Sequence, residues 1–118
     1  MAGSAANVRL FLVGPMGSGK STVGRHLADL LDCPFIDSDA EIESRAGADI
    51  PWIFDVEGEA GFRRRETTVL KDLVEHPAAV IATGGGAILA AENREMMART
   101  GVVVFLNVSV APQLKRTG

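Results

Sequence analysis

The residues best suited to chemistry form a glycine-rich stretch near the N-terminus. Residues 14–21 read G-P-M-G-S-G-K-S, which fits the pattern G-x-x-x-x-G-K-[ST]. Glycines in this pattern allow successive backbone N–H groups to point at phosphate oxygens. Lys20 could then reach the β- and γ-phosphates of a nucleotide, and the Ser21 hydroxyl could ligate Mg²⁺. The pattern predicts a loop that binds ATP or GTP; the alternative is a glycine-rich turn beside an unrelated lysine.

Two carboxylates stand close together shortly after this loop. Asp37 and Asp39 are two positions apart at the end of a short apolar run, so we expect both side chains to leave the same face of the chain. The carboxyl edge of a parallel sheet is where α/β proteins bind ligands. One carboxylate could hold water on Mg²⁺ while the other accepts a proton from a substrate hydroxyl. The alternative makes Asp39 a helix N-cap and Asp37 a solvated loop acid.

A run of arginines follows in a long helical stretch. With Phe62 set at zero, steps of 100° place Glu66 at about 40°, Arg63 at about 100° and Arg64 at about 200°. Arg63 and Glu66 therefore border the inner face of the helix and can pair, whereas Arg64 faces solvent. An inward arginine held by a glutamate suits bidentate capture of a carboxylate. A salt bridge on the helix surface is the alternative.

A run of bare backbone, Thr83-Gly84-Gly85-Gly86, follows a third apolar stretch. Three successive glycines let a small ligand approach the main chain and use its amides, although a flexible turn is the alternative. The aromatic side chains nearby are predicted to be core residues rather than stacking platforms, because aromatic residues usually bury. These are Trp52, Phe54 and Phe62.

The elements that must position these residues alternate along the chain. Short apolar runs predict strands, and apolar residues at helical spacing predict helices between them. The strands are expected over residues 8–13, 34–37, 78–82 and 102–106, and the helices over 21–31, 39–46, around 52–56, 58–75 and 91–100. In the first helix, the apolar side is expected to carry Val23, Leu27, Leu30 and Leu31. Fully apolar strands separated by helices indicate an α/β fold whose parallel sheet is covered on both faces.

Composition limits the class of protein. The 118 residues suit one domain, and 47% hydrophobic with 23% charged residues favours a folded core. The net charge of −3 disfavours a nucleic-acid partner, and no apolar run is long enough to cross a membrane. Cys33 is the only cysteine, so no internal disulfide is possible. Residues 1–7 resemble a flexible leader rather than a signal peptide, and we expect a cytoplasmic, monomeric protein whose core covers residues 8–118.

Taken in order, the motifs G-P-M-G-S-G-K-S-T, F-I-D-S-D, G-F-R-R-R-E and T-G-G-G resemble those of shikimate kinase, and the resemblance extends from about Val8 to Gly118. It implies transfer of the ATP γ-phosphoryl group to the 3-hydroxyl of shikimate, a step of aromatic amino-acid (chorismate) biosynthesis. The implied fold is that of a three-layer P-loop kinase, with a five-stranded parallel sheet in the order 2-3-1-4-5. The implied cofactor is Mg²⁺, with ATP as co-substrate.

The resemblance also implies roles for individual residues. Lys20 and Asp39 would be catalytic, Asp39 being the base that binds shikimate hydroxyls, while Ser21 would hold Mg²⁺ with Asp37 in its outer shell. ATP would be bound by Gly17, Ser18, Gly19, Lys20, Ser21 and Thr22, with Arg116 stacking on adenine. Shikimate would contact Asp39, Arg63 through its carboxylate, the backbone of Gly85, and the pocket walls Phe54 and Phe62, with Glu66 positioning Arg63.

The sequence departs from the family pattern after Gly118. The family continues with a lid that carries an arginine, a fifth strand and an adenine-binding loop, and we expect this chain to be a kinase core that lacks them. Either the chain is a fragment of a longer protein or the protein does without these parts. Two alternatives remain: another small-molecule kinase, such as one for gluconate, and a nucleotide-binding module that senses or sequesters its ligand without phosphoryl transfer.

Overall fold

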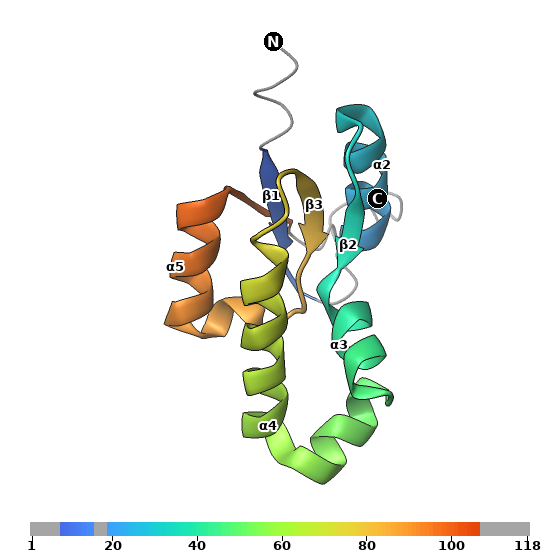
Figure 1. Ribbon diagram of the computed structural model, residues 1–118, viewed down its shortest axis with the longest axis vertical. Coiled ribbons are helices and arrows are strands. Elements are labelled where there is room, and N and C mark those ends of the chain that lie inside the picture. Colours follow the sequence, from blue (N-terminus) through green and yellow to red (C-terminus); the bar gives the residue numbers. More distant parts are fainter. Residues whose placement is uncertain (1–7, 16–18, 107–118) are drawn as a thin grey trace, which may run out of the picture.

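The computed structural model describes residues 8–15 and 19–106 (Figure 1). They form four strands that alternate with helices, as the sequence predicts. The strands are β1 (Arg9–Val13), β2 (Phe35–Asp37), β3 (Ala79–Ala82) and β4 (Val102–Phe105). The helices are α2 (Lys20–Leu31), α3 (Ser38–Ala46), α4 (Ile50–Leu73), the 3₁₀ turn η1 (Ala87–Leu89) and α5 (Ala91–Thr100). No helix among the described residues is both long and apolar enough to span a bilayer.

The four strands form one parallel sheet in the order β2-β3-β1-β4. This arrangement matches the first four positions of the expected order, and the described residues contain no fifth strand. The registers align the carboxyl ends of β2, β3 and β1: Asp37 lies opposite Ala82, and Ala82 lies opposite Leu12. The segments that follow β1, β2 and β3 therefore start at the same level.

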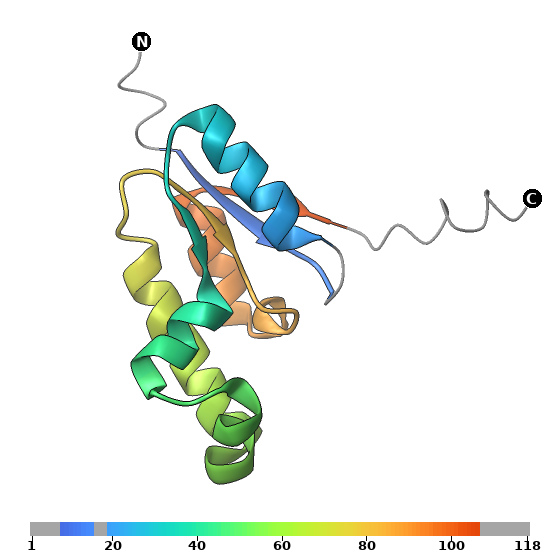
Figure 2. The same ribbon diagram turned by 90° about the vertical axis from the view of Figure 1, so that its right-hand side faces the viewer.

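Helices lie on both faces of the sheet, as Figure 2 shows, with α2 on one side and α4 and α5 on the other. Because successive side chains of a strand point to opposite faces of the sheet, the residues of β1 and β3 belong alternately to two separate hydrophobic cores. Phe11 and Ile81 pack with residues of α4 and α5, whereas Leu12 and Val80 pack with Ala28 of α2. The three-layer α/β prediction is confirmed.

The surface next to α2 differs from the prediction. Of the expected apolar stripe only Leu27 packs against the core; the small residues Gly24 and Ala28 face the sheet, and Leu30 is 69% exposed. The reason is close packing, because a methyl group at Gly24 would lie 2.4 Å from the Phe35 ring. Among the described strands β4 has only β1 as a partner, and Val102 is 55% exposed rather than covered on both faces.

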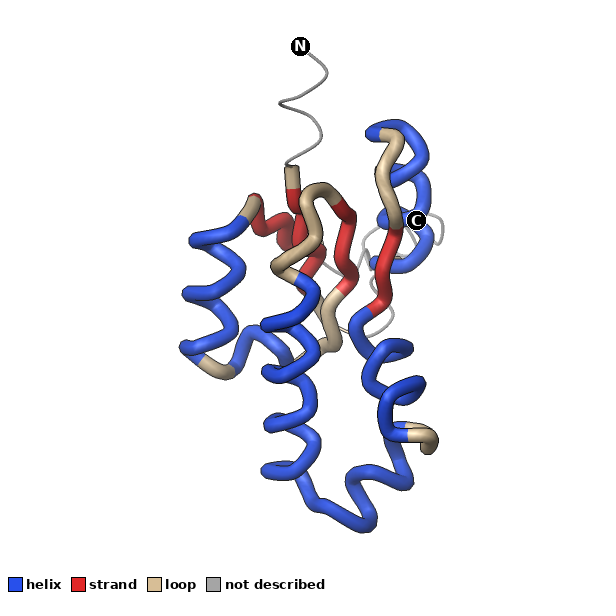
Figure 3. The backbone as a smooth tube through the Cα atoms, in the orientation of Figure 1, coloured by secondary structure: helices blue, strands red, loops and turns tan. Residues whose placement is uncertain are grey.

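Helices α3 and α4 extend past the carboxyl ends of the strands and join in an arch (Figure 3). The two helices predicted on either side of Gly58 are both present within α4 and meet at a kink at this residue, whose φ of 74° and ψ of 176° are not helical. Glycine tolerates this conformation, which side chains disfavour. The bend places the first turns of α4 at the outer end of the arch, so Trp52 is 53% exposed and the prediction that it belongs to the core is wrong.

Candidate active site

The predicted functional residues meet at the carboxyl edge of the sheet. The phosphate loop follows β1, Asp37 ends β2, and Thr83 follows β3, which lies between the other two strands. Thr83 is fixed there by two hydrogen bonds of 3.0 Å, because both its backbone N–H and its hydroxyl donate to the Leu12 carbonyl. The glycine turn, defined here as Gly84–Gly86, is thus held between the phosphate loop and α3.

The described part of the phosphate loop has the geometry of an anion site. Gly14 and Gly19 have φ values of 150° and 86°, which favour glycine, and Lys20 begins α2, whose N-terminus attracts negative charge. The Lys20 ammonium donates to the carbonyls of Gly14 at 2.6 Å and Pro15 at 3.1 Å. A nucleotide phosphate would offer this ammonium a stronger acceptor than either carbonyl.

Charge links this lysine to the acids across the edge. Burial lowers the pKa of Lys20, and the carboxylates of Asp39 and Asp37 oppose that shift. Ser21 and Thr22, in the first turn of α2, are both exposed and therefore accessible to a ligand. Three residues predicted to bind ATP lie outside the described residues: Gly17, Ser18 and Arg116.

The alternative in which Asp39 is the N-cap and Asp37 a solvated loop acid is wrong. Asp37, not Asp39, is the N-cap of α3, and its Oδ1 accepts from the N–H of Asp39 at 2.9 Å and of Ala40 at 3.3 Å. The expectation that both acids leave one face of a strand is also wrong, because Asp39 already lies in the first helical turn. Asp39 is therefore available for another task.

The carboxylate of Asp39 is poorly satisfied. Its Oδ1 is buried, with no hydrogen-bond partner among the described residues. Burial raises the pKa of Asp39, the carboxylates of Asp37 and Glu66 raise it further, and Lys20 partly opposes them. A carboxylate with a raised pKa at the edge of the sheet is suited to accept a hydroxyl proton.

Gly84 separates two of these carboxylates. A methyl group at this position would lie 2.6 Å from Asp39 Oδ1 and 3.2 Å from Glu66 Oε2, which also has no partner among the described residues. From the sequence alone, the three glycines are interpreted only as bare backbone that a ligand can approach. The structure adds that Gly84 is buried against protein side chains, whereas Gly85 is exposed and can present its backbone to a ligand.

Gly84→Ala should displace Asp39 and lower the rate of a reaction that uses Asp39 as a base roughly 10-fold to 10²-fold, since small misplacements of a reacting group have effects of this size. Steady-state kinetics measures the loss, and thermal denaturation shows whether the variant is folded. The same change made beside Asp39→Ala removes the clashing carboxylate, so the two effects should not add. Additive losses would contradict this contact.

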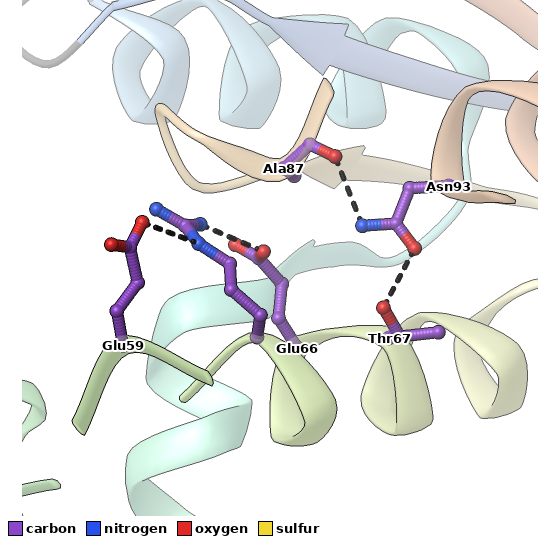
Figure 4. A network of polar contacts seen from close by, with 6 residues as sticks. Glu59, Glu66, Thr67, Ala87 and Asn93 are labelled. Atoms are coloured by element: carbon purple, nitrogen blue, oxygen red, sulfur yellow. Dashed lines mark hydrogen bonds and ion pairs between the residues drawn. The ribbon is translucent and has the colours of Figure 1, made fainter. Parts of the chain in front are cut away.

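Arg63 and Glu66 pair on the inner side of α4, as the helical spacing predicts. Arg63 Nη1 lies 2.9 Å from Glu66 Oε1, and the Glu66 side chain is 3% exposed (Figure 4). The other face of the guanidinium lies on the glycine turn, since a methyl group at Gly86 would lie 2.5 Å from Arg63 Nη2. Glu59, which the sequence did not single out, is 3.6 Å from Arg63 Nε and 67% exposed, so it is a weak competitor for that edge. Arg64 is exposed, as predicted.

The two phenylalanines form a contact beside this arginine. The ring centroids of Phe54 and Phe62 are 4.7 Å apart, and the Arg63 guanidinium carbon lies 5.2 Å from the Phe62 centroid. Phe62 is buried, whereas Phe54 is 36% exposed and so forms an open wall rather than core. Together they provide an apolar surface next to a cationic group.

The model of one protein family, described as shikimate kinase, matches residues 16–118. The chain belongs to the shikimate kinase family. This assignment agrees with the four motifs in the order in which they occur, and it disfavours a gluconate kinase.

Relatives in this family are similar over most of the chain. Shikimate kinases of Halorhodospira halophila and Vibrio cholerae are 60% and 57% identical to it, and each match covers 92% of the chain. The chain spans 62% of the length of either relative. A solved structure of shikimate kinase from Acinetobacter baumannii in complex with shikimate has 55% identity and a TM-score of 0.88, covering 99% of this chain and 66% of that one.

Proposed function

We propose that the protein transfers the γ-phosphoryl group of ATP to the 3-hydroxyl of shikimate. The observation that carries the proposal is the Arg63–Glu66 pair on the glycine turn, at the same sheet edge as Lys20 and Asp39. A candidate carboxylate-binding group and a candidate base would thus lie at the same sheet edge as a candidate phosphate-binding group. Membership of the family and the shikimate complex of the Acinetobacter baumannii enzyme support the same substrate.

The nucleotide would bind at the start of α2. The backbone N–H groups of this helix end and the Lys20 ammonium provide positive charge for the β- and γ-phosphates. Gly19, Ser21 and Thr22 are accessible there. The proposed contacts of Gly17 and Ser18 with phosphate, and of Arg116 with adenine, concern residues outside the described part of the chain.

The residues at this edge also fit Mg²⁺. Its preferred ligands are oxygens, and it is commonly held by one or two protein groups together with substrate phosphates. The exposed Ser21 hydroxyl and the Asp37 carboxylate, of which one oxygen caps α3, offer such a donor set. Bound there, the metal would neutralise charge on the phosphates.

Asp39 is the proposed base. Its carboxylate, whose pKa is raised by burial, accepts the proton of the substrate hydroxyl, and the hydroxyl oxygen then forms a bond with the γ-phosphorus. The bond between that phosphorus and the bridging oxygen breaks, and ADP leaves with the electron pair. Lys20 stabilises the negative charge that develops on the phosphates.

The substrate would be oriented by groups on the arch and the glycine turn. Arg63 binds the carboxylate with two parallel hydrogen bonds, after displacing the exposed Glu59 from its Nε edge. Glu66 holds the guanidinium from the buried side. Gly85 offers its backbone, and Phe54 and Phe62 pack against the apolar face of the ring.

Shikimate-dependent release of ADP from ATP tests the proposal. Shikimate should support turnover, whereas gluconate and the methyl ester of shikimate should not, since the first lacks the ring and the second lacks the charged carboxylate. Binding of both ligands without ADP release would instead favour the binding-module alternative. Equal turnover with the ester would contradict the role of Arg63.

Arg63→Lys should weaken shikimate binding on the order of 10-fold while leaving ATP binding within about twofold. Lysine keeps the charge but cannot make two parallel hydrogen bonds to a carboxylate, and loss of one charge-assisted bond has roughly this effect. Arg64→Lys is the matched control, because Arg64 is exposed on the opposite face. Calorimetric titration of both variants with each ligand gives the comparison, and equal effects at the two positions would contradict the geometry.

We further propose that the protein acts as a cytoplasmic monomer without nucleic-acid or membrane partners. The net charge of −3 and the lack of a membrane-spanning helix among the described residues support this. Light scattering after size exclusion measures the oligomeric state.

A further inference from the structure

A buried asparagine joins two parts of the site. Asn93, in the first turn of α5, is 1% exposed. Its Nδ2 donates to the Ala87 carbonyl at 2.9 Å, and its Oδ1 accepts from the Thr67 hydroxyl at 2.9 Å, as Figure 4 shows. The side chain therefore connects η1 on one side to α4 on the other.

Each of the two partners is attached to a part of the proposed shikimate site. The Ala87 N–H donates to the Gly84 carbonyl at 3.1 Å, and the Leu89 N–H donates to the Gly86 carbonyl at 3.1 Å, so η1 fixes the end of the glycine turn. Thr67 follows Glu66 directly in α4. Asn93 thus joins the support of the glycine turn to the helix that carries Arg63 and Glu66.

We infer that Asn93 is a positioning residue that sets the glycine turn against α4 and thereby shapes the site for the shikimate carboxylate. This inference rests on the proposed function. Asn93 contacts neither Arg63 nor Glu66 by a hydrogen bond, and it acts through Ala87 and Thr67. The site is sensitive to such positioning because Gly86 and the Arg63 guanidinium are already in close contact.

The chemistry of the position requires an amide. Ala87 offers an acceptor and Thr67 donates its hydroxyl, so the side chain between them must donate and accept at once. Aspartate would lose the donor toward Ala87, and leucine would lose both bonds and leave buried polar groups unpaired.

The test uses Thr67→Val, which removes only the hydroxyl at nearly constant shape, and Asn93→Leu, which removes both bonds. Thr67→Ser keeps the hydroxyl and serves as the rescue. Met97→Ala is the control for stability, because Met97 is buried one turn further along α5 and makes no contact with the turn through a hydrogen bond. For each variant, calorimetry gives the dissociation constants of shikimate and of ATP, and thermal denaturation gives Tm.

We expect Thr67→Val and Asn93→Leu to raise the dissociation constant of shikimate about 5- to 10-fold, with that of ATP unchanged within about twofold. Thr67→Ser should bind shikimate like the wild type. Met97→Ala should lower Tm and leave shikimate binding intact. Unchanged shikimate binding in Thr67→Val, or an equal loss in Met97→Ala, would overturn the inference.

A second measurement needs no substrate. Amide hydrogen exchange at Ala87 and Leu89, whose N–H groups donate to the carbonyls of Gly84 and Gly86, should be faster in Thr67→Val than in Thr67→Ser, because the turn loses its link to α4. If the wild-type protein binds no shikimate, the proposed function fails, and exchange at these amides still decides whether Asn93 fixes the turn. Equal exchange in the two variants would overturn the inference even if shikimate binds.

Discussion

Replacing Lys20 with alanine should lower the rate of phosphoryl transfer by about 10²- to 10³-fold. The ammonium is the fixed positive charge at the start of α2, and transfer of a phosphoryl group depends mainly on positioning and on stabilising charge. In the structure it rests on the carbonyls of Gly14 and Pro15, so it is already next to the place where the phosphates would bind. No neighbouring lysine among the described residues could substitute for it, because the next one in the sequence is Lys71 of α4.

Turnover with ATP and shikimate measures this effect, and titration with ATP separates binding from chemistry. Lys71→Ala is the matched control, since Lys71 is exposed and forms only a surface pair with Glu92 at 3.4 Å. It should retain full activity. Near-normal turnover in Lys20→Ala would contradict the assignment of residues 14–21 as a phosphate loop.

The sequence predicts the strands of the sheet well, but it predicts less well which helix residues cover the faces of the sheet. Strands such as 78–82 are apolar throughout, and this property identifies a strand that is buried on both sides, as β3 is. Apolar residues alone could not show which side of α2 faces the sheet. The side of α2 that faces the sheet depends on how closely the helix approaches Phe35. The side that carries Gly24 permits a close approach, whereas the side that carries the bulkier Leu30 would not.

The candidate site could be predicted where one element determines the geometry. The Arg63–Glu66 pair follows from positions on a single helix, and the exposure of Arg64 follows from the same rotation. Contacts between distant segments left no such signal. The approach of Gly84 to Asp39 and the link from Thr67 to Asn93 depend on how β3, α3, α4 and α5 pack.

Asp37 and Asp39 are the same residue type two positions apart, and this small difference in position decides which of them is the N-cap of α3. Either acid could cap α3 by residue type, since aspartate is a favoured N-cap. The structure selects Asp37 because β2 continues to this residue, and the helix then begins at Ser38. Asp39 is left in the first turn with a buried oxygen toward Gly84 and Glu66.

Asp39→Asn should change activity and stability in opposite directions. The amide cannot accept the hydroxyl proton, so phosphoryl transfer should fall about 10²- to 10⁴-fold. The protein should nevertheless melt at a higher temperature near neutral pH. The nearly isosteric side chain removes an ionised group that burial and the carboxylates of Asp37 and Glu66 disfavour.

The sign of the pH dependence follows from the raised pKa of Asp39. A raised pKa means that the folded protein holds this proton more tightly than the unfolded chain. The resulting stability is present at acidic pH and is lost as the pH rises through the folded pKa. The wild type should therefore approach the Tm of Asp39→Asn in acid and fall below it toward neutral pH. Its turnover should rise over the same range as Asp39 ionises.

Thermal denaturation of both proteins between acidic and neutral pH, together with turnover of the wild type, measures these changes. Asp29→Asn is the matched control, because Asp29 is exposed on α2 and its substitution should alter neither quantity. Asp37 is the N-cap of α3, so capping is not the role of Asp39. Retained activity in Asp39→Asn would therefore contradict the role of Asp39 as base. A lower Tm near neutral pH would show that attraction to Lys20 outweighs burial and the neighbouring carboxylates, and the cause given for the raised pKa would then be wrong.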